Sequence, residues 1–359
     1  GTWIFDGDPS ISQTPLHAIR QFLGDHVAVN HVRAMETSRS RSTEGFDEAV
    51  RAAQMSDAVV VFLGEESILS GETHSRADIN LPGNQHELLA ALRQAGKPLI
   101  AVILAGRPLT LANIVDKVDA LLFAWHPGTM GGPAIADVLF GVESPSGKLP
   151  ATFPLMVGQV PIYYAHKNTG RPATPEKFTH IDDIPARMPQ SSWGFASFHL
   201  DAGYEPLYEF GHGLSYTKFV YSDIEVSAAE IALDETVTVT AAVHNEGTME
   251  ADEVVQLYVR DLVGNRHGVR PCCRADPCLQ AEMRAEQHRL VHDAAHADLR
   301  RVTRTHLHGH VVSRQVGNAA VQVQLNLNRI AHVVFQHVHS GRAVRLQTTT
   351  HHALVEPGK

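Results

Sequence analysis

Titratable side chains crowd one short stretch of the chain, ILSGETHSRADINLP, which spans residues 68–82. It closely follows an apolar run, AVVVFLG. A carboxylate presented by such a loop can serve acid–base chemistry in a site shared with another domain. The alternative is a solvated loop in which Arg76 pairs with Glu72 or Asp78. A zinc site is not indicated, because His74 has no partner in this loop at a metal-ligand spacing.

The segments around this loop predict a parallel α/β sheet. The run at 58–63 is continuous and β-branched, as in a strand covered on both faces, and KPLIAVILAG and DALLFAW are similar runs. The helical patterns between and around these runs are FDEAVRAAQM (46–55), NQHELLAALRQAG (84–96), PLTLANIVDKV (108–118) and GGPAIADVLFG (131–141). Strands that alternate with helices indicate βαβ units. Ligands then meet the loops at the carboxyl ends of the strands, which here are residues 68–82, AGRPL and WHPGTMGG.

Several chemistries find no support in residues 1–263. WHPGTMGG has neither GxGxxG spacing nor a GK[ST] motif, so a tight turn before a helix is favoured over a flavodoxin-like nucleotide site. This part of the chain has no G-x-S-x-G elbow and no cysteine, so a serine or cysteine nucleophile is not indicated. The formal net charge of −9 argues against a nucleic-acid binder. No apolar run reaches 18 residues, so no membrane span is expected.

The chain changes character twice towards its C-terminus. Residues 145–201 are rich in loops, and residues 236–261 then alternate as TVTVTAAV, turn at NEGT and continue as EVVQLYVRD, which predicts a hairpin-like β unit. A lone hairpin buries too little to be stable, so we expect the remaining strands of a small β-sandwich after residue 264.

The last 96 residues, 264–359, have an anomalous composition. They hold 12 of the 23 histidines, all three cysteines and 12 arginines against one lysine, with no Trp or Tyr. We expect a disordered tail, and we interpret it as an out-of-frame translation without an evolved function. The alternative is a metal-binding module that uses HLHGH, HVH and the cysteines, but the spacings fit no closed zinc pattern.

Several long stretches resemble glycoside hydrolase family 3, the family of β-glucosidases and β-xylosidases. The stretches are SDAVVVFLGE, GETHSRADINLP, GKPLIAVILAGRPL, AWHPGTMGGPAIADVLFGVESPSGKLPATFP, GQVPIYYAHKNTGRP and PLYEFGHGLSYTKF, all within residues 1–263. The resemblance is to the bacterial periplasmic β-glucosidase branch. It implies an α/β sandwich at 1–200, a linker with a partial fibronectin type III-like domain at 201–263, and then the anomalous tail. It also implies a (β/α)8 barrel that is missing from this chain.

The resemblance assigns a role to the loop at 68–82. Retaining glycosidases use two carboxylates about 5–5.5 Å apart, one as the nucleophile and one as the general acid/base. In the family, an Asp on the barrel is the nucleophile and a Glu on a loop of the sandwich domain is the acid/base. Glu72 stands at that position, so it is the expected acid/base. The role requires a carboxylate whose pKa is raised by burial or by a neighbouring negative charge, and the barrel would supply both effects.

The resemblance also implies substrate-binding candidates, a substrate class and a compartment. His74, Arg76 and Asp78 would touch the sugar or orient Glu72, unless Arg76 and Asp78 only fix the loop. His166 and Arg171, in HKNTGRP, are candidates for a further subsite. The implied substrates are β-glucosides or related oligosaccharides, with no cofactor and no metal.

Without the barrel, we expect the chain to be inactive alone. The chain has neither a signal peptide nor an initial Met, so it looks like a piece of a longer protein. The periplasmic or secreted location therefore follows from the family alone. The alternative function is a non-catalytic carbohydrate-binding or interaction module built on the same sandwich.

Overall fold

The computed structural model describes the chain in eight segments. These are residues 8–164, 171–192, 196–229, 236–257, 309–312, 318–326, 334–339 and 342–347. The chain divides into two compact units. The first comprises Gly1–Glu143 with Lys148–His212, and the second comprises Ser144–Gly147 with Gly213–Lys359.

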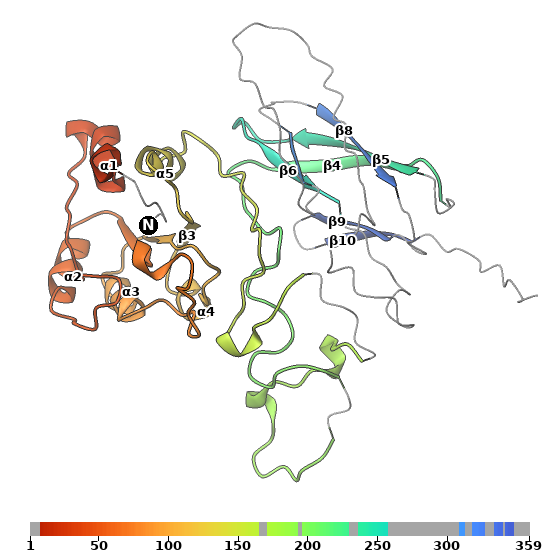
Figure 1. Cartoon of the computed structure of the whole chain (residues 1–359), viewed down its shortest axis with the longest axis horizontal. Helices are drawn as coiled ribbons and strands as arrows, with labels where there is room; N and C mark the ends of the chain where they lie inside the picture. Colours follow the sequence, from red (N-terminus) through yellow and green to blue (C-terminus); the bar gives the residue numbers. More distant parts are fainter. Residues whose placement is uncertain are drawn as a thin grey trace, which may run out of the picture. The chain divides into compact units, whose positions relative to one another are not determined.

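A parallel sheet forms the centre of the first unit (Figure 1). Its strands are β1 (Val59–Gly64), β2 (Leu99–Leu104) and β3 (Ala120–Phe123), in the order β1-β2-β3. Both pairings are parallel, and Val59 lies opposite Leu99 while Ile100 lies opposite Ala120. The parallel α/β sheet predicted from the apolar runs is confirmed.

Helices cover both faces of this sheet (Figure 1). They are α1 (Pro15–Leu23), α2 (Phe46–Gln54), α3 (Gln85–Arg93), α4 (Ala112–Val115) and α5 (Gly131–Leu139). Short 3₁₀ turns lie at Pro9–Ile11, Gly24–His26, Ser67–Leu69, Val157–Gln159, Pro175–Lys177 and Ile181–Asp183. Side chains alternate across a strand, so Val61 and Leu63 pack in the core with α2 and α3, whereas Phe62 packs with α1 and α5. The result is a three-layered α/β sandwich.

Helix α4 is shorter than the sequence predicts. The expected helix at 108–118 is helical only at Ala112–Val115, because the backbone before Ala112 forms hydrogen bonds with another segment. Thr110 forms an isolated parallel bridge with Asn80, and its N–H donates to the Ile79 carbonyl at 3.0 Å. This bridge joins the chain that leaves β2 to the loop that leaves β1.

The second unit contains the β-strands of the C-terminal part. They are β4 (Phe219–Val226), β5 (Thr236–Asn245), β6 (Glu253–Gln256), β7 (Gly309–Val312), β8 (Asn318–Asn326), β9 (Val334–His339) and β10 (Arg342–Gln347). They pair as β4-β5-β8, β6-β7 and β10-β9, and all of these pairings are antiparallel. The unit is therefore built only of antiparallel strands in its described parts.

One expectation for this region changes. The hairpin predicted at 236–261 does not form, because β5 and β6 belong to different sheets, as successive strands of a sandwich can. The four described segments of the tail are strands, and β8 pairs along β5 from Asn318 to Asn326. The prediction of disorder for the rest of the tail lies outside the described residues. The expected extra strands after residue 264 thus occur. Strand β5 pairs with β4 along one edge, and β8 covers its other edge, which would otherwise expose unpaired backbone groups. That the tail is an out-of-frame translation stays a prediction.

Candidate active site

The loop that carries the titratable residues leaves the carboxyl end of β1 and is anchored at both ends. At its start, the Glu65 N–H donates to the Leu104 carbonyl of β2 at 2.8 Å. At its end, Asn80 bridges to Thr110 beyond the carboxyl end of β2. Both anchors belong to the edge of the sheet at which parallel α/β proteins bind ligands. Because the family resemblance makes Glu72 the expected acid/base, we call residues 66–80 the acid/base loop from here on.

Glu72 lies in a tight turn within the acid/base loop. The His74 N–H donates to the Gly71 carbonyl at 3.2 Å, which closes a four-residue turn around Glu72 and Thr73. The Glu72 side chain is exposed, and within the described residues it has no hydrogen bond and no ion pair. Its carboxylate therefore faces solvent and forms no hydrogen bond or ion pair with the other described residues of the loop.

The backbone beside Glu72 is strained. Thr73 has φ 65°, in the left-handed region that β-branched residues rarely adopt, and Trp125 at the end of β3 has φ 51°. Such conformations cost about 1–3 kcal/mol each and persist only where the surrounding structure enforces them. Both residues lie at the carboxyl edge of the sheet, which is consistent with a functional site at this edge.

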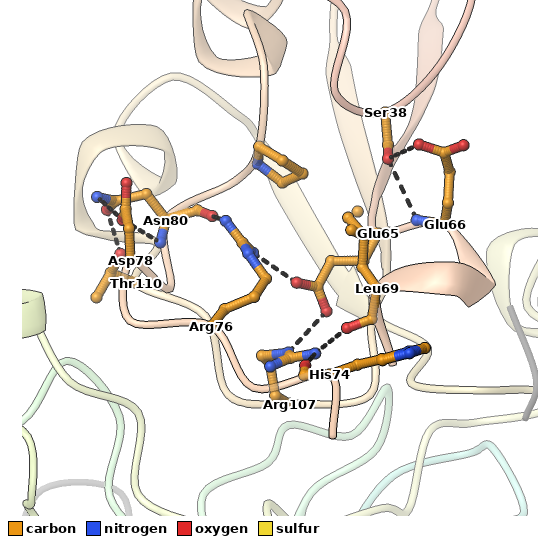
Figure 2. Close-up of polar contacts among 12 residues, drawn as sticks. Ser38, Glu65, Glu66, Leu69, His74, Arg76, Asp78, Asn80, Arg107 and Thr110 are labelled. Carbon is orange, nitrogen blue, oxygen red and sulfur yellow. Dashed lines mark hydrogen bonds and ion pairs between the residues drawn. The ribbon is translucent and has the colours of Figure 1, made fainter. Parts of the chain in front are cut away.

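A buried carboxylate lies beneath the loop. The Glu65 side chain has no exposed surface, and both of its oxygens are used (Figure 2). Its Oε1 pairs with Nη1 of Arg76 at 2.5 Å, and its Oε2 pairs with Nε of Arg107 at 3.0 Å. Charge-assisted hydrogen bonds to two guanidinium groups satisfy this buried carboxylate, which would otherwise be costly to desolvate.

Asp78 fixes the far end of the loop through local hydrogen bonds. Its Oδ1 accepts from the Asn80 N–H at 3.0 Å and from Asn80 Nδ2 at 2.7 Å, while Asn80 Oδ1 accepts from the Thr110 hydroxyl (Figure 2). An Asp that bonds the backbone two residues ahead is a common turn device. Asp78 thus has a structural role in the loop.

One histidine lies within the loop, and a second lies beside it. His74 is half-buried, and its Nδ1 lies 3.1 Å from the Ser70 carbonyl. His126 comes from the loop after β3, and its buried Nδ1 has no hydrogen-bond partner among the described residues. Burial lowers the pKa of its imidazole. A methyl group on Gly106 would lie 2.3 Å from His126 Nε2 and 3.0 Å from Ser70 Oγ, so a larger residue there would have to displace the His126 ring.

A pocket of about 660 Å³ opens on one side of the loop. Its lining includes Arg39, Arg41 and Arg76. Arg39 is paired with Glu66 at 2.9 Å, and that hydrogen bond, with one from Ser38, holds the pKa of Glu66 below its usual range. Since Arg76 is paired with Glu65, two of the three positive charges are neutralised, and the pocket is not strongly basic.

The structure brings together four of the six candidates named from the sequence. Glu72, His74, Arg76 and Asp78 share the acid/base loop, but Arg76 pairs with Glu65 and not with Glu72 or Asp78. The alternative in which Arg76 pairs with Glu72 or Asp78 is therefore wrong, because it took account only of acids within the loop. His166 lies outside the described residues. Arg171 is exposed in a separate segment, where its carbonyl accepts from the Ser197 N–H at 3.4 Å.

Sequence reasoning missed the roles of Glu65 and Arg107. Glu65 is not among the candidates named from the sequence, and Arg107 enters only as part of the AGRPL loop. The available signal was their position, because each directly follows a predicted strand or its terminal glycine in a sheet whose strands are parallel.

Within the described residues, no group of three or more His, Cys, Asp or Glu side chains could hold a metal ion. In the same part of the chain, no helix has the length and apolarity needed to cross a membrane.

Comparison with known proteins finds relatives named as beta-glucosidases and beta-xylosidases. The chain is 38% identical over 284 residues to the periplasmic beta-glucosidase of Salmonella typhimurium, in an alignment that covers 74% of this chain and 35% of the relative. It is 36% identical to a beta-xylosidase of Formosa agariphila, covering 72% of this chain and 32% of the relative. The chain thus spans about a third of the length of these curated relatives.

Solved structures agree with the sequence relatives. The beta-glucosidase of Listeria innocua in complex with glucose matches with a TM-score of 0.67 and 27% identity, covering 97% of this chain and 40% of that one. The same enzyme in complex with isofagomine matches with a TM-score of 0.66 and 28% identity, covering 90% of this chain and 38% of that one. The sequence profile of the glycosyl hydrolase family 3 C-terminal domain matches residues 1–216, which is more than half of the chain. The chain therefore belongs to the glycosyl hydrolase family 3 C-terminal domain family.

Proposed function

We propose that this chain contributes the general acid/base carboxylate, Glu72, to a retaining β-glycosidase that releases terminal β-linked glucose or a related sugar. The observation that carries the proposal is the presentation of Glu72, a carboxylate that is exposed and has no partner among the described residues, on a loop that is otherwise tied down by ion pairs and hydrogen bonds. A carboxylate that must reach a substrate on another surface needs this combination of a free head group and a fixed backbone.

The chemistry has two steps. In the first, the protonated Glu72 carboxyl donates its proton to the glycosidic oxygen while the nucleophile, an Asp of a (β/α)8 barrel domain, attacks the anomeric carbon. In the second, the Glu72 carboxylate removes a proton from water, which attacks the glycosyl-enzyme and releases the sugar. An exposed carboxylate becomes an effective general acid only when a second surface covers it, so the barrel domain is required as a partner.

The relatives support the substrate class without fixing the sugar. Their names include beta-glucosidases and beta-xylosidases, and the Listeria innocua structures include complexes with glucose and with laminaribiose. Glucose-like β-linked substrates are therefore the first to test. The relative named as periplasmic supports a periplasmic or secreted location for the working enzyme.

The test is the release of nitrophenol from an aryl β-glucoside by the 359-residue chain, alone and mixed with a separately expressed family 3 barrel domain. We expect activity only in the mixture, and its loss in Glu72→Gln. Glu44→Gln, which changes an exposed glutamate on a different loop, is the matched control and keeps full activity. Binding of the sugar without hydrolysis in any mixture would instead indicate a non-catalytic carbohydrate-binding module.

A further inference from the structure

The buried Glu65 carboxylate holds the acid/base loop through two arginines. Arg107 binds Glu65 through its Nε and donates through its Nη2 to the Leu69 carbonyl and, at 3.1 Å, to the His74 carbonyl (Figure 2). Leu69 and His74 lie on the two sides of the turn that carries Glu72. The guanidinium of Arg107 therefore fixes both ends of that turn relative to Glu65.

Arg76 holds the following part of the loop in the same way. It binds Glu65 through Nη1 and donates through Nη2 to the Asn80 carbonyl at 3.0 Å. The side chains of Arg76 and Arg107 are only 18% and 20% exposed, so each cation depends on Glu65 for compensation of its charge. One carboxylate thus orders three carbonyl groups spread over residues 69–80.

We infer that Glu65 is a positioning residue for Glu72. Glu65 does not touch substrate in this account, because its side chain is fully enclosed beneath the loop. It acts by keeping the two guanidinium groups in place, and they keep the Glu72 turn at a fixed height above the sheet. The inference rests on the proposed function, since positioning matters for catalysis only if Glu72 is the acid/base.

Glu65→Gln is the substitution that tests this most sharply. The amide keeps the volume of the carboxyl group but removes its charge, and its NH₂ group faces an arginine donor where an acceptor is needed. Removal of one partner of a buried ion pair leaves the other charges uncompensated, which favours opening of the loop. The neighbouring Glu66→Gln is the matched control, because Glu66 pairs with Arg39, a side chain that is 56% exposed and outside the loop.

The first readout needs no enzymatic activity. Trypsin cleaves after arginine, so cleavage between Arg76 and Ala77 in the full chain, followed by mass spectrometry, reports opening of the loop. We expect cleavage at this bond to be at least about tenfold faster in Glu65→Gln than in the unchanged chain and in Glu66→Gln, because proteolysis follows the population of the open form. Equal rates in all three proteins would overturn the inference.

The second readout uses the active mixture with the barrel domain. A displaced acid/base slows the hydrolysis of aryl β-glucosides with poor leaving groups more than the hydrolysis of those with good ones. Only a poor leaving group needs full protonation of the glycosidic oxygen. We expect Glu65→Gln to lower kcat/KM, which reports the first step, at least about tenfold more for a phenyl β-glucoside than for a dinitrophenyl β-glucoside. An equal loss for both substrates would indicate a merely structural role and would overturn the inference.

Arg107→Lys resolves the case in which Glu65→Gln fails to fold. Lysine keeps the positive charge beside Glu65 but lacks the planar fork that reaches the Leu69 and His74 carbonyls together. We expect faster cleavage after Arg76 and the same dependence on the leaving group, and unchanged cleavage would overturn the inference. If Glu72→Gln leaves hydrolysis intact while Glu65→Gln opens the loop, the proposed function fails and the assignment of Glu65 to loop order stands.

Discussion

Gln85 is the residue whose replacement should weaken the first unit most through hydrogen bonds alone. It is 2% exposed, and its side-chain oxygen accepts from the Gly64 N–H at 2.7 Å. Its Nε2 lies 2.7 Å from the Gly64 carbonyl, 2.9 Å from that of Ser38 and 3.0 Å from that of Pro82. One amide at the start of α3 thus joins the end of β1 to two loops beside the acid/base loop.

The perturbation is Gln85→Met, which keeps the length of the side chain and removes its polar atoms. The two buried groups of Gly64 lose their side-chain partner, at about 1–3 kcal/mol each. The bonds to Ser38 and Pro82 are only partly buried, so water replaces them in part. Burial of the thioether offsets about 1 kcal/mol. We therefore expect the free energy of unfolding of the first unit to fall by about 3 kcal/mol.

The assay is urea unfolding followed by tryptophan fluorescence. Trp125 belongs to the first unit, and the sequence of the second unit contains no tryptophan, so the signal reports the first unit. Gln94→Met, an exposed position just after the same helix, is the matched control and should change the stability by less than about 0.5 kcal/mol. If Gln85→Met changes the stability as little as Gln94→Met does, the reasoning is refuted.

Two further predictions use the same assay. Gly64→Ala would place a methyl group 1.9 Å from the Leu104 carbonyl oxygen of β2, so we expect the free energy of unfolding to fall by more than about 3 kcal/mol. Gly96 has φ 69° and open space around it, so Gly96→Ala should lower the free energy of unfolding by only about 1 kcal/mol. Similar losses for the two alanine variants would contradict the close approach of β1 and β2. Burial lowers the pKa of His126, so the unfolded chain binds the proton more readily, and stability should fall as the pH drops below about 6.5 and through the folded pKa. His126→Gln should lose less stability than the unchanged chain between pH 7.5 and pH 5, and an equal loss would show that His126 is not responsible.

The regular part of the first unit was predictable because its signals are local. Three elements can each be identified without knowledge of the rest. They are β1 from its β-branched run, β2 from its apolar run, and α3 from the glycine that terminates it, Gly96. Helix α1 was missed although its signals are present. Thr14 accepts from the His17 N–H as an N-cap, Pro15 is the first helical residue, and Gly24 ends the helix at φ 58°.

The contacts that order the site were not predictable in the same way. Glu65 and Arg107 are 42 residues apart, and they meet only because β1 and β2 are adjacent and parallel. A local search pairs Arg76 with acids of its own loop, whereas the buried partner lies 11 residues before it. The separation of β5 and β6 into different sheets likewise depends on the strands that pair with them, β8 and β7, which follow much later in the chain.

The central claim is that Glu72 acts as the general acid/base, and its most direct test is the leaving-group dependence of Glu72→Ala in the mixture with a family 3 barrel domain. The account predicts that kcat/KM for a phenyl β-glucoside falls by about 10²–10⁴-fold. Hydrolysis of a dinitrophenyl β-glucoside should fall far less and should recover in the presence of azide, which attacks the glycosyl-enzyme without the aid of a base. Equal losses for the two substrates, with no recovery in azide, would contradict the claim.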